Sequence, residues 1–267
     1  MKKRACEEVG IQTHGHELDE SVSEEELVKL VRDLNANKDV HGILVQLPLP
    51  SHINERRVLD EISVQKDVDG LHPYNIGSLV LRGCEPSFVA CTPLVRSSGN
   101  VMLGGISPFM TSFCLFLGTQ GCMELLRRYN IPIRGKRAVV IGRSNIVGLP
   151  MSQLLLKEDA TVTCCHSKTE DIASYVREAD ILVAAIGKAE FVKGSWLKPG
   201  AVVIDVGMNR VDDETKQKGY RLVGDVEQEE CRKRASAITP VPGGVGPMTI
   251  AMLLNNTVSS AMTMYSS

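Results

Sequence analysis

A short β-branched run, 138–141, ends at Gly142 and is followed by an apolar stretch of helical character over 146–157. This order predicts a strand, a tight turn and a helix, the unit that points backbone N–H groups and a helix N-terminus at a phosphate. The glycine fingerprint of dinucleotide-binding turns is incomplete, because Ser144 and Val147 stand where the second and third glycines would be. Taken alone, the turn is as compatible with an ordinary buried strand–helix connection as with a cofactor site.

The next strand-like run, 160–165, ends in His166-Ser167-Lys168 rather than in Asp or Glu. An acid at this point hydrogen-bonds the ribose 2′-hydroxyl of NAD, and none is present. Arg143 in the preceding turn, together with Ser167 and Lys168, offers instead a cation and donors to a 2′-phosphate. These residues favour NADP over NAD, although Arg143 alone is also compatible with a solvated turn residue.

Further strand-like runs at 180–187, 201–207 and 222–225 alternate with helical stretches. This alternation predicts an α/β fold with a doubly wound parallel sheet and helices on both faces. The chain of 267 residues is long enough for two modest domains.

The first 70 residues carry a second α/β pattern. A helix is expected to stop at Gly10, and Ser23 with its following acidic residues resembles a capping box that opens another helix. An apolar strand over 40–50 is halted by prolines. A short helix over 54–62 precedes a charged turn over 66–70.

Composition argues against several classes of protein. A formal net charge of −2 and a pI near 6.3 give no electrostatic reason to expect nucleic acid or an anionic membrane as a partner. The eight cysteines include no Cys-x-x-Cys pair and indicate reduced, intracellular thiols rather than a disulfide framework or a zinc site. His14 and His16 have no neighbours in sequence that complete a metal shell, so no metal site is expected.

One internal segment raises the question of a membrane span. Residues 97–123 contain no charged side chain, and 101–118 are strongly apolar. A span needs about 20 consecutive apolar residues, and here Gly104-Gly105 and Pro108 interrupt the run. We therefore expect no membrane partner, with a transmembrane segment as a minor alternative.

Five motifs occur in an order and at spacings that match one enzyme family. They are Val45–Leu49 (VQLPL), Lys66–Gly70 (KDVDG), Gly142–Pro150 (GRSNIVGLP), His166–Thr169 (HSKT) and Thr239–Thr249 (TPVPGGVGPMT). Through them the chain resembles the bifunctional 5,10-methylenetetrahydrofolate dehydrogenase / 5,10-methenyltetrahydrofolate cyclohydrolase family. The resemblance covers essentially everything except residues 94–119, and His166-Ser167 resembles the branch of that family that uses NADP.

The resemblance implies two α/β domains with a folate cleft between them. It assigns 1–93, completed by 248–267, to a folate and catalytic domain, 94–119 to an atypical insert, and 120–247 to a Rossmann-like NADP-binding domain. The implied cofactor is NADP. The implied partners are one-carbon derivatives of tetrahydrofolate and a second copy of the chain, since the family dimerises through its cofactor domains. The expected location is the cytoplasm, with mitochondria and plastids left open.

The resemblance also implies roles for individual residues. Lys2 matches the family's catalytic lysine, Gln46 its polar partner, and Asp69 the carboxylate that holds the pterin. The cofactor-binding positions are Gly142, Arg143, Ser144 and Ser167, and the substrate-binding positions are Val45, Gln46, Leu47, Asp69, Pro242, Gly243, Gly246, Pro247 and Thr249. Without the resemblance, a solvated lysine, a strand-ending glutamine, a turn-capping aspartate and a plain interdomain connector would explain the same residues.

These residue types suit the two reactions of the family. In the first, hydride leaves the one-carbon bridge of methylenetetrahydrofolate for the nicotinamide, so the protein needs mainly to align two flat ligands. Asp69 can orient the pterin by accepting hydrogen bonds from its N–H groups. In the second, water adds to the methenyl cation, and Lys2, with its amine held by Gln46, can carry the proton.

Two departures from the family pattern put activity in question. The family has a strand, the start of a helix and a tyrosine before the lysine, whereas Met1 directly precedes Lys2 here. A frayed first turn would disturb the fixed geometry that a catalytic amine needs. Residues 94–119 follow Cys91-Thr92-Pro93 where the family continues directly, and we expect a retained intron or a gene-model error as their origin.

Two other functions therefore stay open at this point. One is a catalytically impaired isoform that retains the NADP-binding and dimerisation domain. The other is a different NADP-dependent dehydrogenase of two-domain build, such as a shikimate-type enzyme, against which the 66–70 turn and the 242–247 loop argue.

Overall fold

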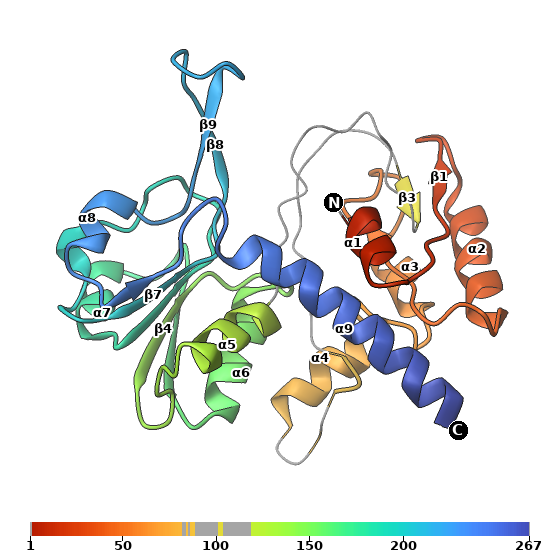
Figure 1. Cartoon of the computed structure of the whole chain (residues 1–267), viewed down its shortest axis with the longest axis horizontal. Coiled ribbons are helices and arrows are strands. Elements are labelled where there is room, and N and C mark those ends of the chain that lie inside the picture. The colour runs from red at the N-terminus through yellow and green to blue at the C-terminus, as the bar shows by residue number, and fades with distance from the viewer. Residues whose placement is uncertain (1, 82–83, 85, 89–100, 104–118, 267) are drawn as a thin grey trace. The chain divides into compact units, whose positions relative to one another are not determined.

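The computed structural model describes residues 2–81, 84, 86–88, 101–103 and 119–266. The chain divides into two compact units, the first made of residues 1–115 and 250–267 and the second of residues 116–249 (Figure 1). None of the described helices is long and apolar enough to cross a membrane. The apolar segment that raised this question, 101–118, lies outside the described residues except at 101–103.

The second unit is built on a five-stranded, all-parallel sheet with the order β10-β7-β6-β4-β5. Its strands are short runs of mostly β-branched residues, which suit a sheet buried on both faces. They are β4 Arg137–Ile141, β5 Thr161–Cys165, β6 Ile181–Ala184, β7 Val202–Asp205 and β10 Ala237–Ile238.

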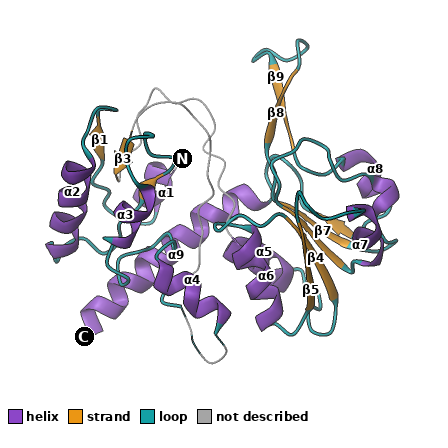
Figure 2. Cartoon of the chain, turned by 180° about the vertical axis from the view of Figure 1, so that it is seen from behind, coloured by secondary structure: helices purple, strands orange, loops and turns teal. Residues whose placement is uncertain are grey.

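Helices cover both faces of this sheet (Figure 2). Alternate strand residues point to opposite faces. Val140 therefore joins the core under α5 (Thr119–Arg128) and α6 (Gly148–Lys157). Val139 joins the core under α7 Ile172–Glu178, the 3₁₀ helix η1 Gly194–Trp196 and α8 Gln228–Arg232. The predicted doubly wound α/β fold is confirmed.

One predicted strand of this sheet is wrong. The run 222–225 was expected in the parallel sheet, but β9 (Tyr220–Val223) pairs antiparallel with β8 (Asn209–Asp212) as a separate hairpin. Half-buried and exposed residues alternate along β8 and along β9 up to the buried Val223, and Arg210 is stacked over the Tyr220 ring at 3.9 Å. Arg210 and Arg221 are exposed, a pattern typical of antiparallel strands that face solvent. The edge position beside β7 in the parallel sheet is taken by β10 instead.

The first unit holds a small antiparallel sheet in which β3 lies between β1 and β2. The strand predicted over 40–50 is limited to the two residues of β2, and β3 falls inside the segment 94–119. The elements are α1 Lys2–Glu8, β1 His16–Leu18, α2 Glu24–Ala36, β2 Val45–Gln46, α3 Glu55–Asp60, α4 Pro73–Val80, β3 Val101–Leu103 and the helix α9 Val245–Ser266, which belongs to this unit from Ile250 onward.

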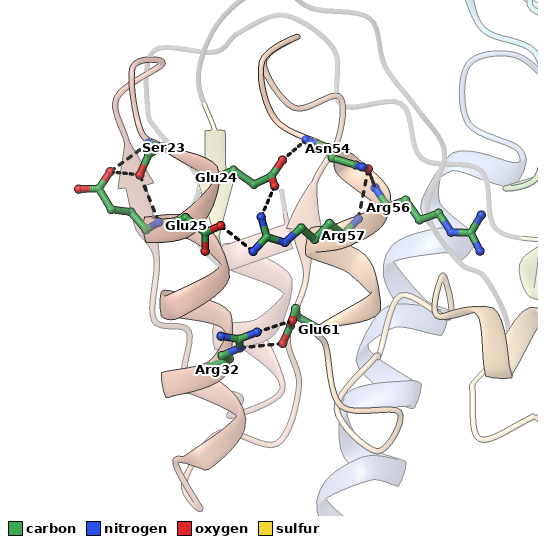
Figure 3. A network of polar contacts seen from close by, with 9 residues as sticks. Ser23, Glu24, Glu25, Arg32, Asn54, Arg56, Arg57 and Glu61 are labelled. Atoms are coloured by element: carbon green, nitrogen blue, oxygen red, sulfur yellow. Dashed lines mark hydrogen bonds and ion pairs between the residues drawn. The ribbon is translucent and has the colours of Figure 1, made fainter.

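A polar network joins α2 to α3 (Figure 3). Ser23 forms the predicted capping box at the start of α2. Glu24 accepts hydrogen bonds from the Asn54 backbone N–H, at 2.6 Å, and from Arg57. Arg32 binds Glu61 through two guanidinium nitrogens, at 2.9 and 2.7 Å. Each exposed pair contributes little alone, so the network chiefly fixes the alignment of the two helices.

Candidate functional site

The turn after β4 requires glycine at its first position. Gly142 has φ +126°, and a Cβ atom there would lie 2.2 Å from the Ala185 carbonyl oxygen. Its N–H donates to the Cys165 carbonyl at 2.8 Å, so Gly142 lies between the ends of β5 and β6. β5 and β6 lie on opposite sides of β4, so the order of the strands reverses at this point. Open α/β sheets bind dinucleotides at such a switch point.

The start of α6 is capped and packed by two nearby residues. Ser144 Oγ accepts the N–H groups of Val147 and Gly148, at 3.2 and 3.3 Å. A Cβ on Gly148 would lie 2.1 Å from the Gly142 carbonyl oxygen, so this glycine permits the close approach of helix and turn. Sequence reasoning looked for the third glycine at position 147 and missed its replacement one residue later. The signal was present, since Gly148 belongs to the recognised motif.

Arg143 and Ser167 lie beyond the ends of neighbouring strands. Ile141 of β4 pairs in register with Cys165 of β5, and both Arg143 and Ser167 are exposed just after those residues. A turn closed by the Thr169 N–H donating to the His166 carbonyl, at 2.8 Å, presents Ser167. The structure thus places at one sheet edge the cation and hydroxyl that were predicted to recognise a 2′-phosphate.

The loop before α9 presents part of the predicted substrate segment to solvent. Gly243 has φ +104°, and the Gly244 N–H donates to the Pro240 carbonyl at 3.0 Å before the helix begins at Val245. Of the predicted residues, Pro242, Gly243 and Pro247 are exposed, Gly246 is half-buried and Thr249 is buried.

In the first unit, β2 lies beside the charged turn. Val45 and Leu47 are buried, whereas Gln46 is half-buried between them, because side chains alternate along a strand. Gln46 Nε2 donates to the Leu47 carbonyl at 3.2 Å. Ile43 bridges Asp67 in parallel, with the Ile43 N–H donating to the Lys66 carbonyl at 2.7 Å. The structure thus brings the segments that carry Gln46 and Asp69 together.

Two of the three charged residues in the 66–70 turn, Lys66 and Asp67, form hydrogen bonds to backbone groups. Lys66 is buried and its ammonium donates to three carbonyls at the end of α2, those of Leu34, Asn35 and Asn37, at 3.2, 2.8 and 2.7 Å. A cation at a helix C-terminus is also favoured by the helix dipole.

Asp67 is buried and accepts the N–H groups of Leu71 and His72 and the side-chain amide of Asn75. Burial raises the pKa of Asp67, against the effect of these donors.

Asp69 is buried too, at 2% exposure. Asn256 on α9 donates to the carbonyl of the preceding residue, Val68, at 3.0 Å, and Leu253 packs on the Val68 side chain. The turn is therefore fixed from α2 on one side and α9 on the other, which holds the Asp69 carboxyl in a defined place.

Lys2 lies on α1, which ends before Gly10 at φ +77°, as predicted. The residue is half-buried and its Nζ atom is shielded from solvent. Burial raises the pKa of Cys6, one helical turn away, and the positive charge of Lys2 opposes that rise. A fully solvated lysine, one of the alternatives, does not describe this environment.

The described residues contain no group of three or more His, Cys, Asp or Glu side chains that could hold a metal ion. The turn at Gly142, with Arg143 and Ser167 exposed beside it, suits a phosphate-bearing cofactor, because its donors and its cation can face an anion.

Two family models match the chain. The catalytic domain of tetrahydrofolate dehydrogenase/cyclohydrolase matches residues 1–69, and the NAD(P)-binding domain of the same enzymes matches residues 118–265. The bifunctional protein FolD 2 of Arabidopsis thaliana is 55% identical over 264 residues, which cover 99% of this chain and 80% of that protein. The chain belongs to the tetrahydrofolate dehydrogenase/cyclohydrolase family.

Other members agree with this assignment. The chloroplastic FolD 4 of Arabidopsis thaliana is 55% identical over 97% of this chain and 65% of its own length. A solved dehydrogenase-cyclohydrolase of Trypanosoma brucei, complexed with NADP cofactor and an inhibitor, superposes with a TM-score of 0.86 at 43% identity. That match covers all of this chain and 82% of the Trypanosoma chain.

Family membership confirms the function predicted from the motifs. The chain is a bifunctional methylenetetrahydrofolate dehydrogenase/cyclohydrolase of one-carbon folate metabolism, with an NAD(P)-binding domain over 118–265. The alternative of a different dehydrogenase class is set aside.

Proposed function

We propose that this chain oxidises 5,10-methylenetetrahydrofolate with NADP and hydrolyses the product to 10-formyltetrahydrofolate. The observation that carries the choice of NADP is the placement of Arg143 and Ser167 at the ends of neighbouring parallel strands around Gly142. A guanidinium and a hydroxyl at that edge suit a 2′-phosphate, and no acid occupies the position that would bind a 2′-hydroxyl.

The residue roles divide between the two reactions. When bound, NADP accepts the hydride. Asp69, held in place by the 66–70 turn, orients the pterin through its N–H groups. Lys2 carries the proton in the hydrolytic step, with Gln46 holding its amine. Val45 and Leu47 support Gln46, and the 242–249 loop lies over the substrate. The proposed division of the chain is a folate domain over 1–93 with 248–267, an insert over 94–119 and an NADP domain over 120–247.

The proposal extends to assembly. Leu149 and Leu156 on α6 are 41% and 48% exposed, and seven residues apart they lie on one helix face. An exposed apolar pair in the second unit supports a homodimer formed through the cofactor domains. Analytical ultracentrifugation of the wild type and of Leu156→Glu tests it: we expect a dimer and a weakened dimer respectively, and a monomeric wild type would contradict it.

The proposed location is the cytoplasm. The described cysteines Cys6, Cys84, Cys122, Cys164, Cys165 and Cys231 are free, as suits a reducing compartment. Relatives carry the names chloroplastic and mitochondrial as well, so cell fractionation decides between these compartments.

The activity test follows the formation of the methenyl product by absorbance. The assay uses NADP and compares the chain as written with a variant that lacks residues 94–119 and carries the family's N-terminal strand and tyrosine. We expect both proteins to turn over. Turnover by the repaired protein alone would favour the impaired isoform, and turnover by neither folded protein would overturn the proposal.

A further inference from the structure

A fully buried carboxylate in the second unit lies outside the predicted site. Asp225 follows β9 and has no exposed surface. Its Oδ2 accepts the N–H groups of Ile186 and Gly187, at 2.7 and 3.0 Å, and its Oδ1 accepts the N–H of Lys188 at 2.8 Å. Three successive N–H groups that converge in this way form a concave anion site. Here the anion is a side chain of the protein itself.

The segment held by Asp225 borders the cofactor turn. Residues 186–188 directly follow Ala185, whose carbonyl oxygen is the atom that a Cβ on Gly142 would strike at 2.2 Å. They leave the carboxyl end of β6 on the side of β4 opposite to β5. Asp225 therefore fixes the backbone that borders the switch point on the β6 side, while Arg143 and Ser167 lie on the β5 side.

A second buried acid holds Asp225 in position. Asp205, at the end of β7, accepts the Asp225 N–H at 2.9 Å and the Val226 N–H at 3.1 Å. A Cβ on Gly224 would lie 1.7 Å from the Asp205 carboxylate, so only glycine allows this approach. The ends of β6, β7 and β9 are thus tied together by two carboxylates.

We propose that Asp225 is a positioning residue for the nicotinamide half of NADP. This inference rests on the proposed use of NADP. The two halves of a dinucleotide lie on the two sides of the switch point. Because the 2′-phosphate donors are on the β5 side, the nicotinamide half falls to the β6 side, where residues 186–188 form the border. Asp225 sets the backbone of that border without touching the cofactor.

The test separates the two halves of the ligand. Asp225→Asn keeps the side-chain volume but turns an acceptor into an N–H₂ group that faces backbone donors. Calorimetry measures the Kd of NADP and of adenosine 2′,5′-bisphosphate, a probe of the 2′-phosphate side alone. We expect about a tenfold higher Kd for NADP and less than a twofold change for the bisphosphate. Asp212→Asn, an exposed change of equal charge on β8, should alter neither.

Equal weakening of both ligands, or no change in either, would overturn the inference. If Asp225→Asn does not fold, Asn209→Ala replaces it, because it removes only the 2.9 Å donor from Asn209 Nδ2 to Asp225. The same selective loss, of about threefold, is then expected, and a loss for both ligands or neither contradicts the inference. Failure of the proposed function is distinguishable, since wild type would then bind neither NADP nor the bisphosphate.

Discussion

In the first unit, Lys66, Asp67 and Asp69 lie on one turn, whereas in the second unit Asp205 and Asp225 meet from the ends of two strands. Lys66 and Asp67 bind backbone groups at the end of α2 and the start of α4. Asp205 and Asp225 bind backbone groups of three strand ends. Burial of a charged side chain therefore does not identify it as catalytic, because most of the buried charged side chains described here form hydrogen bonds to backbone groups.

The distinction that remains is between charges that fix the backbone and those that the proposal assigns to ligands. In the first group are Lys66, Asp67, Asp205 and Asp225. In the second are Lys2 and Asp69, of which Asp69 lies on the turn that Lys66 and Asp67 help to hold. Substitutions in the first group should change the free energy of unfolding, with Asp225→Asn also weakening NADP binding, and those in the second should change turnover.

The largest effect is expected at Lys2. Lys2→Met should lower cyclohydrolase turnover about a hundredfold or more, because the proposed proton carrier is lost, while dehydrogenase turnover falls much less. The thermal midpoint should stay within about 2 °C of the wild type. Following formation of 10-formyltetrahydrofolate from the methenyl substrate measures this directly. Equal loss of both activities would place Lys2 among the structural charges.

Lys66→Met gives the opposite outcome. The substitution removes three donors to the carbonyls of Leu34, Asn35 and Asn37, so the free energy of unfolding should fall by about 2 kcal/mol. Denaturant titration measures this change. Turnover per folded molecule should stay near the wild-type value. A selective loss of turnover without loss of stability would contradict the assignment of Lys66 to the structural charges.

At the cofactor edge, Arg143→Ala should raise the KM for NADP about tenfold and leave the KM for NAD nearly unchanged, since only NADP carries a 2′-phosphate. Steady-state kinetics with both cofactors decides this. Lys136→Ala, an exchange of another cation in the same unit, serves as the control. If the preference for NADP persists in Arg143→Ala, the assignment of the 2′-phosphate site is wrong.

The most gradual effect is a pH dependence that Asp205 produces. Burial raises the pKa of Asp205 to about 7 from an ordinary value of 3.8. The folded state keeps this proton between those values while the unfolded state releases it, so this contribution to stability falls as pH rises through that window. The slope should be on the order of 1 kcal/mol per pH unit.

Unfolding of wild type and of Asp205→Asn from pH 4 to 8 measures that slope. The stability of the wild type relative to the variant should decline up to about pH 7 and then level off. A constant difference across the whole range would show that Asp205 does not titrate within it.

The sequence predicts those features that neighbouring residues determine. The capping box at Ser23 follows from four adjacent residues, and the turn at Gly142 follows from a strand that meets a glycine. The pairing of Asp205 with Asp225 joins residues twenty positions apart through a hairpin, and no local pattern reports it. Gly148 was missed because spacing was matched to a fixed fingerprint, whereas close packing depends on which residue approaches the turn.

Strand assignment failed for a related reason. Tyr220–Val223 has the composition of a strand, but only its partner decides whether it joins the parallel sheet or a hairpin. The helix α4 went unpredicted, although His72 caps it and Pro73 is at its first turn, where proline is well tolerated. Its position follows from the Asp67 turn, which binds the backbone at His72 and the side chain of Asn75.

The most direct test of the central distinction compares two neighbouring aspartates in the same turn. Asp69→Asn and Asp67→Asn are each assayed for methylenetetrahydrofolate oxidation at saturating NADP and for the free energy of unfolding. We predict that Asp69→Asn loses about a hundredfold in kcat/KM for the folate with little change in stability. Asp67→Asn should lose about 2 kcal/mol of stability and keep its turnover per folded molecule. Wild-type kcat/KM in Asp69→Asn would contradict the account.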